Sequence, residues 1–215
     1  MRPLDAIALE AGTDKSSSFH NYAATYDELF GHLRNAPCKI LEIGVLRGES
    51  MRMWLEGFPQ AEVHGVDIKL SNTTISDPRL TLHEMNAASP SLRALCDKHG
   101  PFDFVIEDSK HHVEITRPIV QTVFPNYIKP GGWMVIEDTH AGWSTKKKGV
   151  DGSRIVARHR DGLHIYARSM VDAVSRNRWI DDKTLNVWPE VSIFDAAIRQ
   201  VVYRPKLCMI QKHYA

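Results

Sequence analysis

The stretches "CKILEIGV" (38–45) and "AEVHGVDI" (61–68) decide the fold. Each is a short apolar run rich in β-branched residues, and the intervening segment "SMRMWLEGF" (50–58) places apolar residues at helical intervals. The first run ends at Gly44 with Gly48 close behind, and the second ends in Asp67. A strand, a glycine-containing turn, a helix and a strand closing in an acid predict a βαβ unit.

The alternation of strands and helices continues along the chain. Strands are predicted at 79–85, 102–108 and 131–138, and helices at 89–99 and 116–124, with Pro90 near the start of the first helix and Thr116 as the N-cap candidate of the second. Repeated βα units predict a Rossmann-like α/β fold, with a doubly wound, mainly parallel sheet and right-handed crossovers.

The remaining segments complete a single domain. Residues 1–37 are expected to form an N-terminal helical cap on the domain proper, 38–215. Glycines, charges and weak periodicity predict a long loop over 139–164, followed by a helix near 165–178. The segment 197–212 reads as two strands joined around Pro205, which would add a C-terminal antiparallel hairpin to the sheet.

Composition limits the possible functions. The 215 residues are 43% hydrophobic, and 27 basic against 26 acidic side chains give a net charge of +1, without the basic footprint of a nucleic-acid binder. No apolar stretch is long enough for a membrane span, and acids interrupt the N-terminal segment where a signal peptide needs an apolar core. Three widely spaced cysteines predict neither a disulfide framework nor a thiolate zinc site. We therefore expect a cytosolic protein, with a homodimer as the commonest assembly.

Acidic residues end several of the predicted strands, most clearly in "FVIEDSKHH" (104–112) and "MVIEDTH" (134–140). Carboxylates gathered at one sheet edge repel one another unless a cation lies among them. Glu42, inside the first strand, disfavours a pyrophosphate and suits a cationic ligand such as the sulfonium of S-adenosylmethionine. Asp67 is placed to bind a ribose diol.

The motifs "LEIGV", "GVDI", "FDFVIED" and "GGWMVIED" resemble those of the class I S-adenosylmethionine-dependent methyltransferases. More narrowly, "GTDK" (12–15), "S-x-R-M-W" (50–54), "IEDSKHH" and "VIED" resemble the metal-dependent sugar O-methyltransferases of the mycinamicin-type macrolide deoxysugar group. Ser109-Lys110 stands where that family has Gly-Ser, and Asn86-Ala87 where it has an acid and a glutamine.

The resemblance implies a set of site residues. Mg²⁺ would be held by Asp108, Glu137 and Asp138, with His111 as the general base. S-adenosylmethionine would be contacted by Glu42, Gly44, Ser50, Asp67, Asn86, Ala87 and Glu107. The roles of His112 and His140 stay open.

The chemistry of these residues agrees with that implication. Carboxylates without cysteine are hard ligands that favour Mg²⁺ or Mn²⁺, and two vicinal sugar hydroxyls can chelate such an ion. Catechol-like diols would need the same chelation, so an O-methyltransferase of aromatic acceptors is the nearest alternative. A nicotinamide-dependent oxidoreductase is a further alternative, although the phosphate-binding glycines are missing. A module that binds cofactor without catalysis is another. Tyr22, Tyr26 and Trp54 are expected to pack in the core.

Overall fold

A computed structural model describes residues 1–148, 154–158, 162–176 and 197–214. The chain divides into two units, Met1–Val105 and Ile106–Ala215. Each unit is described by itself below.

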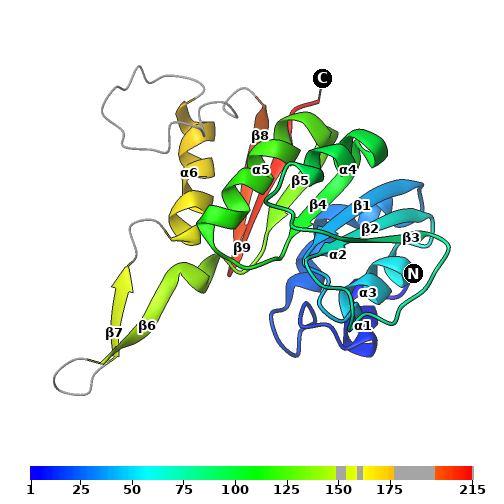
Figure 1. Ribbon diagram of the computed structural model, residues 1–215, viewed down its shortest axis with the longest axis horizontal. Helices are drawn as coiled ribbons and strands as arrows, with labels where there is room; N and C mark the ends of the chain where they lie inside the picture. Colours follow the sequence, from blue (N-terminus) through cyan, green and yellow to red (C-terminus); the bar gives the residue numbers. More distant parts are fainter. Residues whose placement is uncertain (149–153, 159–161, 177–196, 215) are drawn as a thin grey trace. The chain divides into compact units, whose positions relative to one another are not determined.

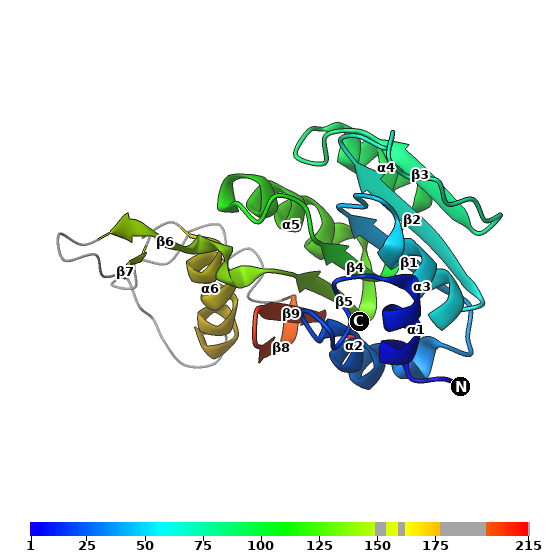
Figure 2. The same cartoon turned by 90° about the horizontal axis from the view of Figure 1, so that it is seen from below.

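Three parallel strands form the centre of the first unit: β1 (Cys38–Ile43), β2 (Ala61–Asp67) and β3 (Leu80–Glu84). Figure 2 shows α4 (Ser91–His99) on one side of these strands, with α1 (Leu4–Ala11) and α3 (Glu49–Gly57) on the other. α2 (Tyr22–Phe30) and the short 3₁₀ helix η1 (Gly31–Leu33) precede β1. The predicted βαβ unit is therefore present.

Aromatic side chains fill the core of the first unit. Trp54, Tyr26 and Phe30 are fully buried, and the Phe30 ring stacks on Phe104 with centroids 4.3 Å apart. Aromatic pairs of this kind add roughly 0.5–1.5 kcal/mol beyond the area that they bury. Tyr22 is 1% exposed and its ring lies 6.3 Å from that of Tyr26. The packing role predicted for Tyr22, Tyr26 and Trp54 is confirmed.

The second unit is built on β5 (Ile128–Ile136), β9 (Leu207–Lys212) and β8 (Ile198–Arg204), paired antiparallel (Figure 1). α5 (Val113–Tyr127) packs on β5, and α6 (Leu163–Arg176) contacts α5, β8 and β9. β8 and β9 are the hairpin predicted around Pro205.

β4 (Phe102–Glu107) spans the boundary between the two units. The seven strands hydrogen-bond in the order β3-β2-β1-β4-β5-β9-β8. The predicted Rossmann-like, mainly parallel sheet with a C-terminal antiparallel hairpin is confirmed. None of the described helices combines the length and apolar character that crossing a bilayer requires.

Two local predictions were wrong. The predicted loop at 139–164 contains η2 (Thr139–Gly142) and a separate two-stranded sheet of β6 (Trp143–Lys148) and β7 (Arg154–Arg158). Antiparallel pairing satisfies the backbone groups of these strands, and the glycine-rich stretch between them, which favoured a loop, lies outside the described residues.

The start of α5 also differs from the prediction. The helix begins at Val113, with His112 in the N-cap position, so Thr116 lies inside it. Instead of capping the helix, the buried Thr116 hydroxyl donates a 2.7 Å hydrogen bond to Oε2 of Glu107. This tertiary contact outweighed the local N-cap preference of threonine.

Candidate functional site

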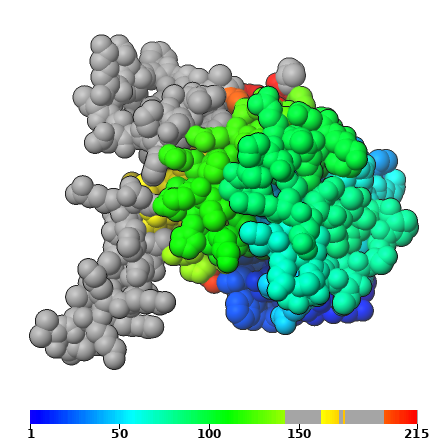
Figure 3. Space-filling view, viewed as in Figure 1, coloured from blue at the N-terminus to red at the C-terminus, as the bar shows by residue number. Residues whose placement is uncertain are grey.

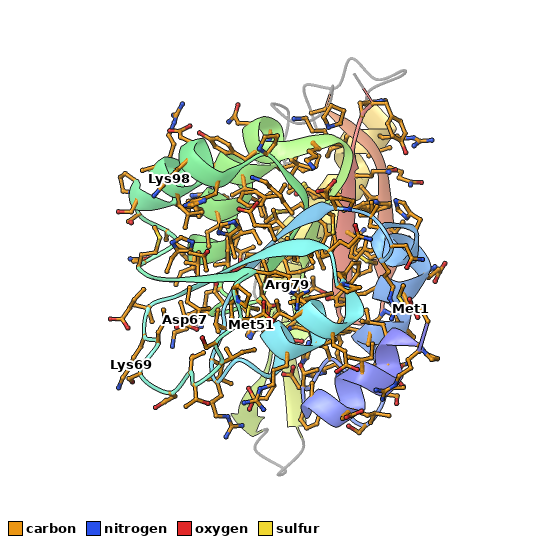
Figure 4. All side chains as sticks on the ribbon, turned by 90° about the vertical axis from the view of Figure 1, so that its right-hand side faces the viewer. Met1, Met51, Asp67, Lys69, Arg79 and Lys98 are labelled. Atoms are coloured by element: carbon orange, nitrogen blue, oxygen red, sulfur yellow. The ribbon has the colours of Figure 1, made fainter. Side chains whose placement is uncertain are left out.

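The turn after β1 is held by the carboxylate of Asp67 at the end of β2. Its Oδ2 accepts hydrogen bonds from the backbone N–H groups of Val45 and Leu46 at 2.8 and 2.9 Å, and its Oδ1 accepts one from Lys69 (Figure 4). Gly44 and Gly48 adopt φ of 107° and 92°, which favours glycine at both positions. Asp67 thus fixes the conformation of the turn in which Gly44 lies, and three backbone groups already use part of its acceptor capacity.

Glu42 lies at the centre of a buried polar network in the first unit. Ser50 donates a 2.7 Å hydrogen bond to Oε1, and the indole of Trp54 donates to Oε2. The ammonium group of Lys15, which is 1% exposed, lies 3.7 Å from Oε1. The negative charge of Glu42 is therefore shared with a buried cation of the protein itself.

The role of Lys15 was not predicted from the sequence. The residue closes the "GTDK" motif that carries part of the family resemblance, so its place in that motif was the available signal. Ser50 was predicted to contact the cofactor. In the structure, its hydroxyl group donates a hydrogen bond to Glu42.

Asn86 shapes the turn before α4. Its Oδ1 accepts from the backbone N–H of Ala88 at 2.9 Å, and its carbonyl accepts from Ser89. Asn86 is exposed and the adjacent Ala87 is partly exposed. Asn86 therefore forms these hydrogen bonds with residues that lie close to it in the sequence.

In the second unit, Glu107 at the end of β4 is fully buried. The hydroxyl groups of Ser109 and Thr116 donate to its two carboxylate oxygens. Burial raises the pKa of Glu107, and the hydrogen bonds from the two hydroxyls offset part of that rise. Ser109 anchors the loop to this carboxylate through its hydroxyl.

Directly beyond Glu107, the structure brings Asp108, His111 and Asp138 together, so that one ligand atom from each lies within 4.8 Å of the others. Nε2 of His111 is 3.6 Å from Oδ2 of Asp138, and Nδ1 is 4.0 Å from Oδ1 of Asp108. His111 and Asp138 adopt φ of 54° and 51°, a conformation that costs most residues about 1–2 kcal/mol. Aspartate and histidine enter this region more readily than most residues, and two such positions in one cluster are typical of a functional site.

The other predicted residues lie around this cluster. Glu137 is 2% exposed and is not one of the three grouped residues, although its backbone N–H donates to the carbonyl of Glu107 at 3.0 Å. His140 places Nδ1 3.8 Å from Oδ1 of Asp138 and is half-exposed. His112 is exposed at the start of α5.

Residues 41–139 match the profile of a family described as a methyltransferase domain. Two curated relatives are O-methyltransferases of Streptomyces olivaceus. The 8-demethyl-8-(2-methoxy-alpha-L-rhamnosyl)-tetracenomycin-C 3'-O-methyltransferase is 30% identical over 82% of this chain and 46% of its own length. The 8-demethyl-8-alpha-L-rhamnosyl tetracenomycin-C 2'-O-methyltransferase is 34% identical over 75% of this chain and 46% of its own length.

Among solved structures, the methyltransferase MycE of the mycinamycin biosynthetic pathway, in complex with Mg and SAH, has the same fold. It superposes with a TM-score of 0.80 at 24% identity, over 99% of this chain and 54% of its own. The chain thus spans about half the length of the relatives that it matches. The resemblance to methyltransferases predicted from the sequence motifs is confirmed.

Proposed function

We propose that this chain transfers a methyl group from S-adenosylmethionine to a sugar hydroxyl, with Mg²⁺ bound by the carboxylates that end β4 and β5. The observation that carries the proposal is the position of His111 between the carboxylates of Asp108 and Asp138. This arrangement joins a proton acceptor to two hard oxygen ligands, which are the groups that a metal-assisted O-methylation needs.

The residues fit the proposed ion. Asp108 and Asp138 offer carboxylate oxygens, which Mg²⁺ prefers, and no thiol belongs to the described cluster. Glu137, predicted as a third ligand, lies next in sequence to Asp138. When bound, Mg²⁺ lowers the proton affinity of hydroxyl groups that it coordinates and orients them.

His111 is proposed to take the proton of the acceptor hydroxyl. Its Nδ1 is buried, so Nε2 is the ring nitrogen that an acceptor can reach. The imidazolium formed in this step lies beside the two carboxylates, which stabilise its charge. In the transfer itself, the hydroxyl oxygen forms a bond to the methyl carbon while the carbon–sulfur bond of the donor breaks. General-base assistance of this kind is worth roughly 10²–10⁴ in rate.

The methyl donor is assigned to the first unit. S-adenosylmethionine supplies an electrophilic methyl group on a sulfonium. Asp67 has capacity left on Oδ1 for a ribose hydroxyl, since one backbone N–H occupies that oxygen. Glu42 remains a predicted contact of the sulfonium-bearing end, although its carboxylate is fully buried and its charge is shared with Lys15. Gly44, Ser50, Asn86 and Ala87 remain predicted contacts in this unit, and Glu107, which lies in the second unit, remains a predicted contact as well.

The acceptor class follows from the relatives, whose names specify rhamnosyl groups on tetracenomycin-C. We therefore propose a deoxysugar of a natural product as the acceptor. A cytosolic location and a homodimeric assembly belong to the same proposal.

The decisive experiment combines the full chain, S-adenosylmethionine and Mg²⁺ with a panel of rhamnosylated and catechol acceptors. We expect S-adenosylhomocysteine release, and mass spectrometry should place one added methyl group on the sugar. EDTA should abolish turnover and excess Mg²⁺ should restore it.

Three results would each contradict a different part of the proposal. Methylation of the catechols alone would replace sugars by aromatic diols as acceptors. Turnover that is unchanged in EDTA would exclude the metal role. Failure to bind S-adenosylmethionine in calorimetry, with the chain folded by circular dichroism, would refute the proposal as a whole.

A further inference from the structure

Three imidazoles gather in the first unit, on residues that the proposed function does not use. His64 lies in β2, His83 in β3, and His99 is the last residue of α4. One ring nitrogen from each lies within 4.8 Å of the others. His64 is fully buried, and the other two are partly exposed.

The strand register explains why these side chains meet. Successive residues of a strand point to opposite faces, and the Gly65 position faces Met51 of α3. His64 therefore points to the opposite face, which is the side covered by α4 (Figure 2). His83 pairs with Val66 in the parallel register, two residues beyond His64, and so shares that face.

The third imidazole comes from the end of α4. Lys98, labelled in Figure 4, marks the end of the helix at which His99 lies. The His99 ring centroid is 4.5 Å from that of His64 and 5.4 Å from that of His83. The teal-to-green surface in Figure 3 belongs to the part of the chain that includes α4 and the connection from β2 to β3. Because His83 and His99 are partly exposed, an ion from solution can reach the edge of the cluster.

The hydrogen bonds of His64 define which nitrogen is available. Its Nε2 lies 2.8 Å from Oε1 of Glu62, which has no proton to donate, so Nε2–H is the donor. In the neutral ring, Nδ1 then carries a lone pair, and it accepts a 3.2 Å hydrogen bond from Nε2–H of His83, which a bound cation would replace. A carboxylate that fixes the tautomer of a histidine is the usual partner of a metal-binding imidazole.

The surroundings of His64 and His83 favour the neutral form of both imidazole rings. Burial lowers the pKa of His64, and burial followed by the neighbouring imidazoles lowers the pKa of His83 to about 4. Neutral imidazole is the form that binds metal ions. Glu62 also pairs with Lys39 at 3.3 Å, which holds the carboxylate in place beside His64.

We propose that His64, His83 and His99 form a second metal site, which takes a late first-row divalent cation such as Zn²⁺. Zinc–nitrogen bonds of about 2.0–2.1 Å in a tetrahedral site place two ligand nitrogens about 3.3 Å apart, close to the 3.2 Å between His64 and His83. Three protein ligands leave a fourth position for water. Imidazole suits zinc, copper and nickel better than Mg²⁺, so this site and the carboxylate cluster select different ions.

The test is equilibrium dialysis of the full chain against Zn²⁺ in the presence of excess Mg²⁺. We expect the unaltered chain to retain one equivalent of zinc. His83→Ala and His99→Ala should lose this zinc, whereas Asp138→Asn should retain it. Glu62→Gln should weaken zinc binding by about 10–100-fold, because it acts through the orientation of His64. His32→Ala, which removes an exposed histidine of the same unit, is the matched control and should bind like the unaltered chain.

X-ray absorption of the zinc-loaded, unaltered chain gives a readout that does not depend on the folding of any variant. It should show three imidazole nitrogens at about 2.0–2.1 Å. A zinc shell dominated by carboxylate oxygens would overturn the proposal. So would the absence of retained zinc, or equal retention by His83→Ala, His99→Ala and His32→Ala.

Discussion

The Nε2 atom of His111 lies 3.6 Å from Oδ2 of Asp138, and both residues have a left-handed backbone. His111 follows β4 and Asp138 follows β5, so tertiary structure joins two segments that the sequence separates. Asp108 completes the cluster on the Nδ1 side of the ring. Strain at both positions is tolerated because the two strands fix where the chain must turn.

Replacing His111 by alanine should lower kcat by about 10²–10⁴, because the acceptor hydroxyl loses its general base. Affinity for S-adenosylmethionine should be unchanged, which calorimetry can measure alongside turnover. His112→Ala is the matched control, since the adjacent imidazole is exposed at the start of α5. Normal turnover of His111→Ala, or equal losses in the two variants, would contradict the assignment.

Asp108→Asn and Asp138→Asn should each weaken Mg²⁺ binding at least about tenfold, because an amide keeps one oxygen but loses the charge that attracts the ion. Titration calorimetry with Mg²⁺ measures this directly. Glu137→Gln tests the third predicted ligand in the same assay. The exposed Glu114→Gln on α5 serves as the control. If Glu114→Gln weakened binding as much as Asp138→Asn, general charge rather than ligation would explain the losses.

Lys15→Met should destabilise the fold by about 3–5 kcal/mol, because it leaves the buried carboxylate of Glu42 without its cation. The double variant Lys15→Met/Glu42→Gln should recover part of this loss, since the remaining amide is neutral. Urea unfolding of the single and double variants measures the coupling. Lys39→Met, which breaks a more exposed ion pair with Glu62, should have a much smaller effect. Strictly additive effects of the Lys15 and Glu42 changes would show that the two do not interact.

Asp67→Asn should weaken S-adenosylmethionine binding at least about tenfold. The amide nitrogen of asparagine cannot accept the N–H groups that Asp67 now binds at Val45, Leu46 and Lys69, so at least one hydrogen bond is lost. Asp77→Asn is a suitable control, because Asp77 also accepts a backbone N–H but lies at the far end of the β2–β3 connection, close to the start of β3. Cofactor affinity that is equal in the two variants would exclude a special role for Asp67.

All three cysteines are buried free thiols, and burial raises the pKa of Cys96 and of Cys208 to about 12. The thiolate is the reactive form, so the native chain should resist Ellman's reagent at pH 8, whereas denaturant should release three reactive groups. These thiols favour the folded state fully below pH 9, and that contribution is lost as the pH rises towards 12. Rapid native reaction of Cys96 or Cys208 would contradict their burial.

The sequence by itself determined the order of strands and helices, because apolar runs with period 2 or 3.6 commit the backbone locally. Acids at the ends of parallel strands predicted a charged cluster at one edge of the sheet. The family resemblance implied Asp108, Glu137 and Asp138 as metal ligands and His111 as base, and the structure groups Asp108, His111 and Asp138 but not Glu137. The family motifs supplied the methyltransferase resemblance. The β6–β7 sheet was missed because its glycine-rich connection favours a loop, and the start of α5 was missed because Thr116 is a good N-cap by local rules.

Only the tertiary structure decided how the charged groups are paired. Lys15 lies far from Glu42 in sequence, and no local rule predicts that its ammonium group is buried against that carboxylate. His64, His83 and His99 carry no recognisable motif, and they meet because the register of β2 and β3 and the end of α4 set their positions. Periodicity fixes which face of an element a residue occupies, whereas the distance between residues on different elements depends on how those elements pack.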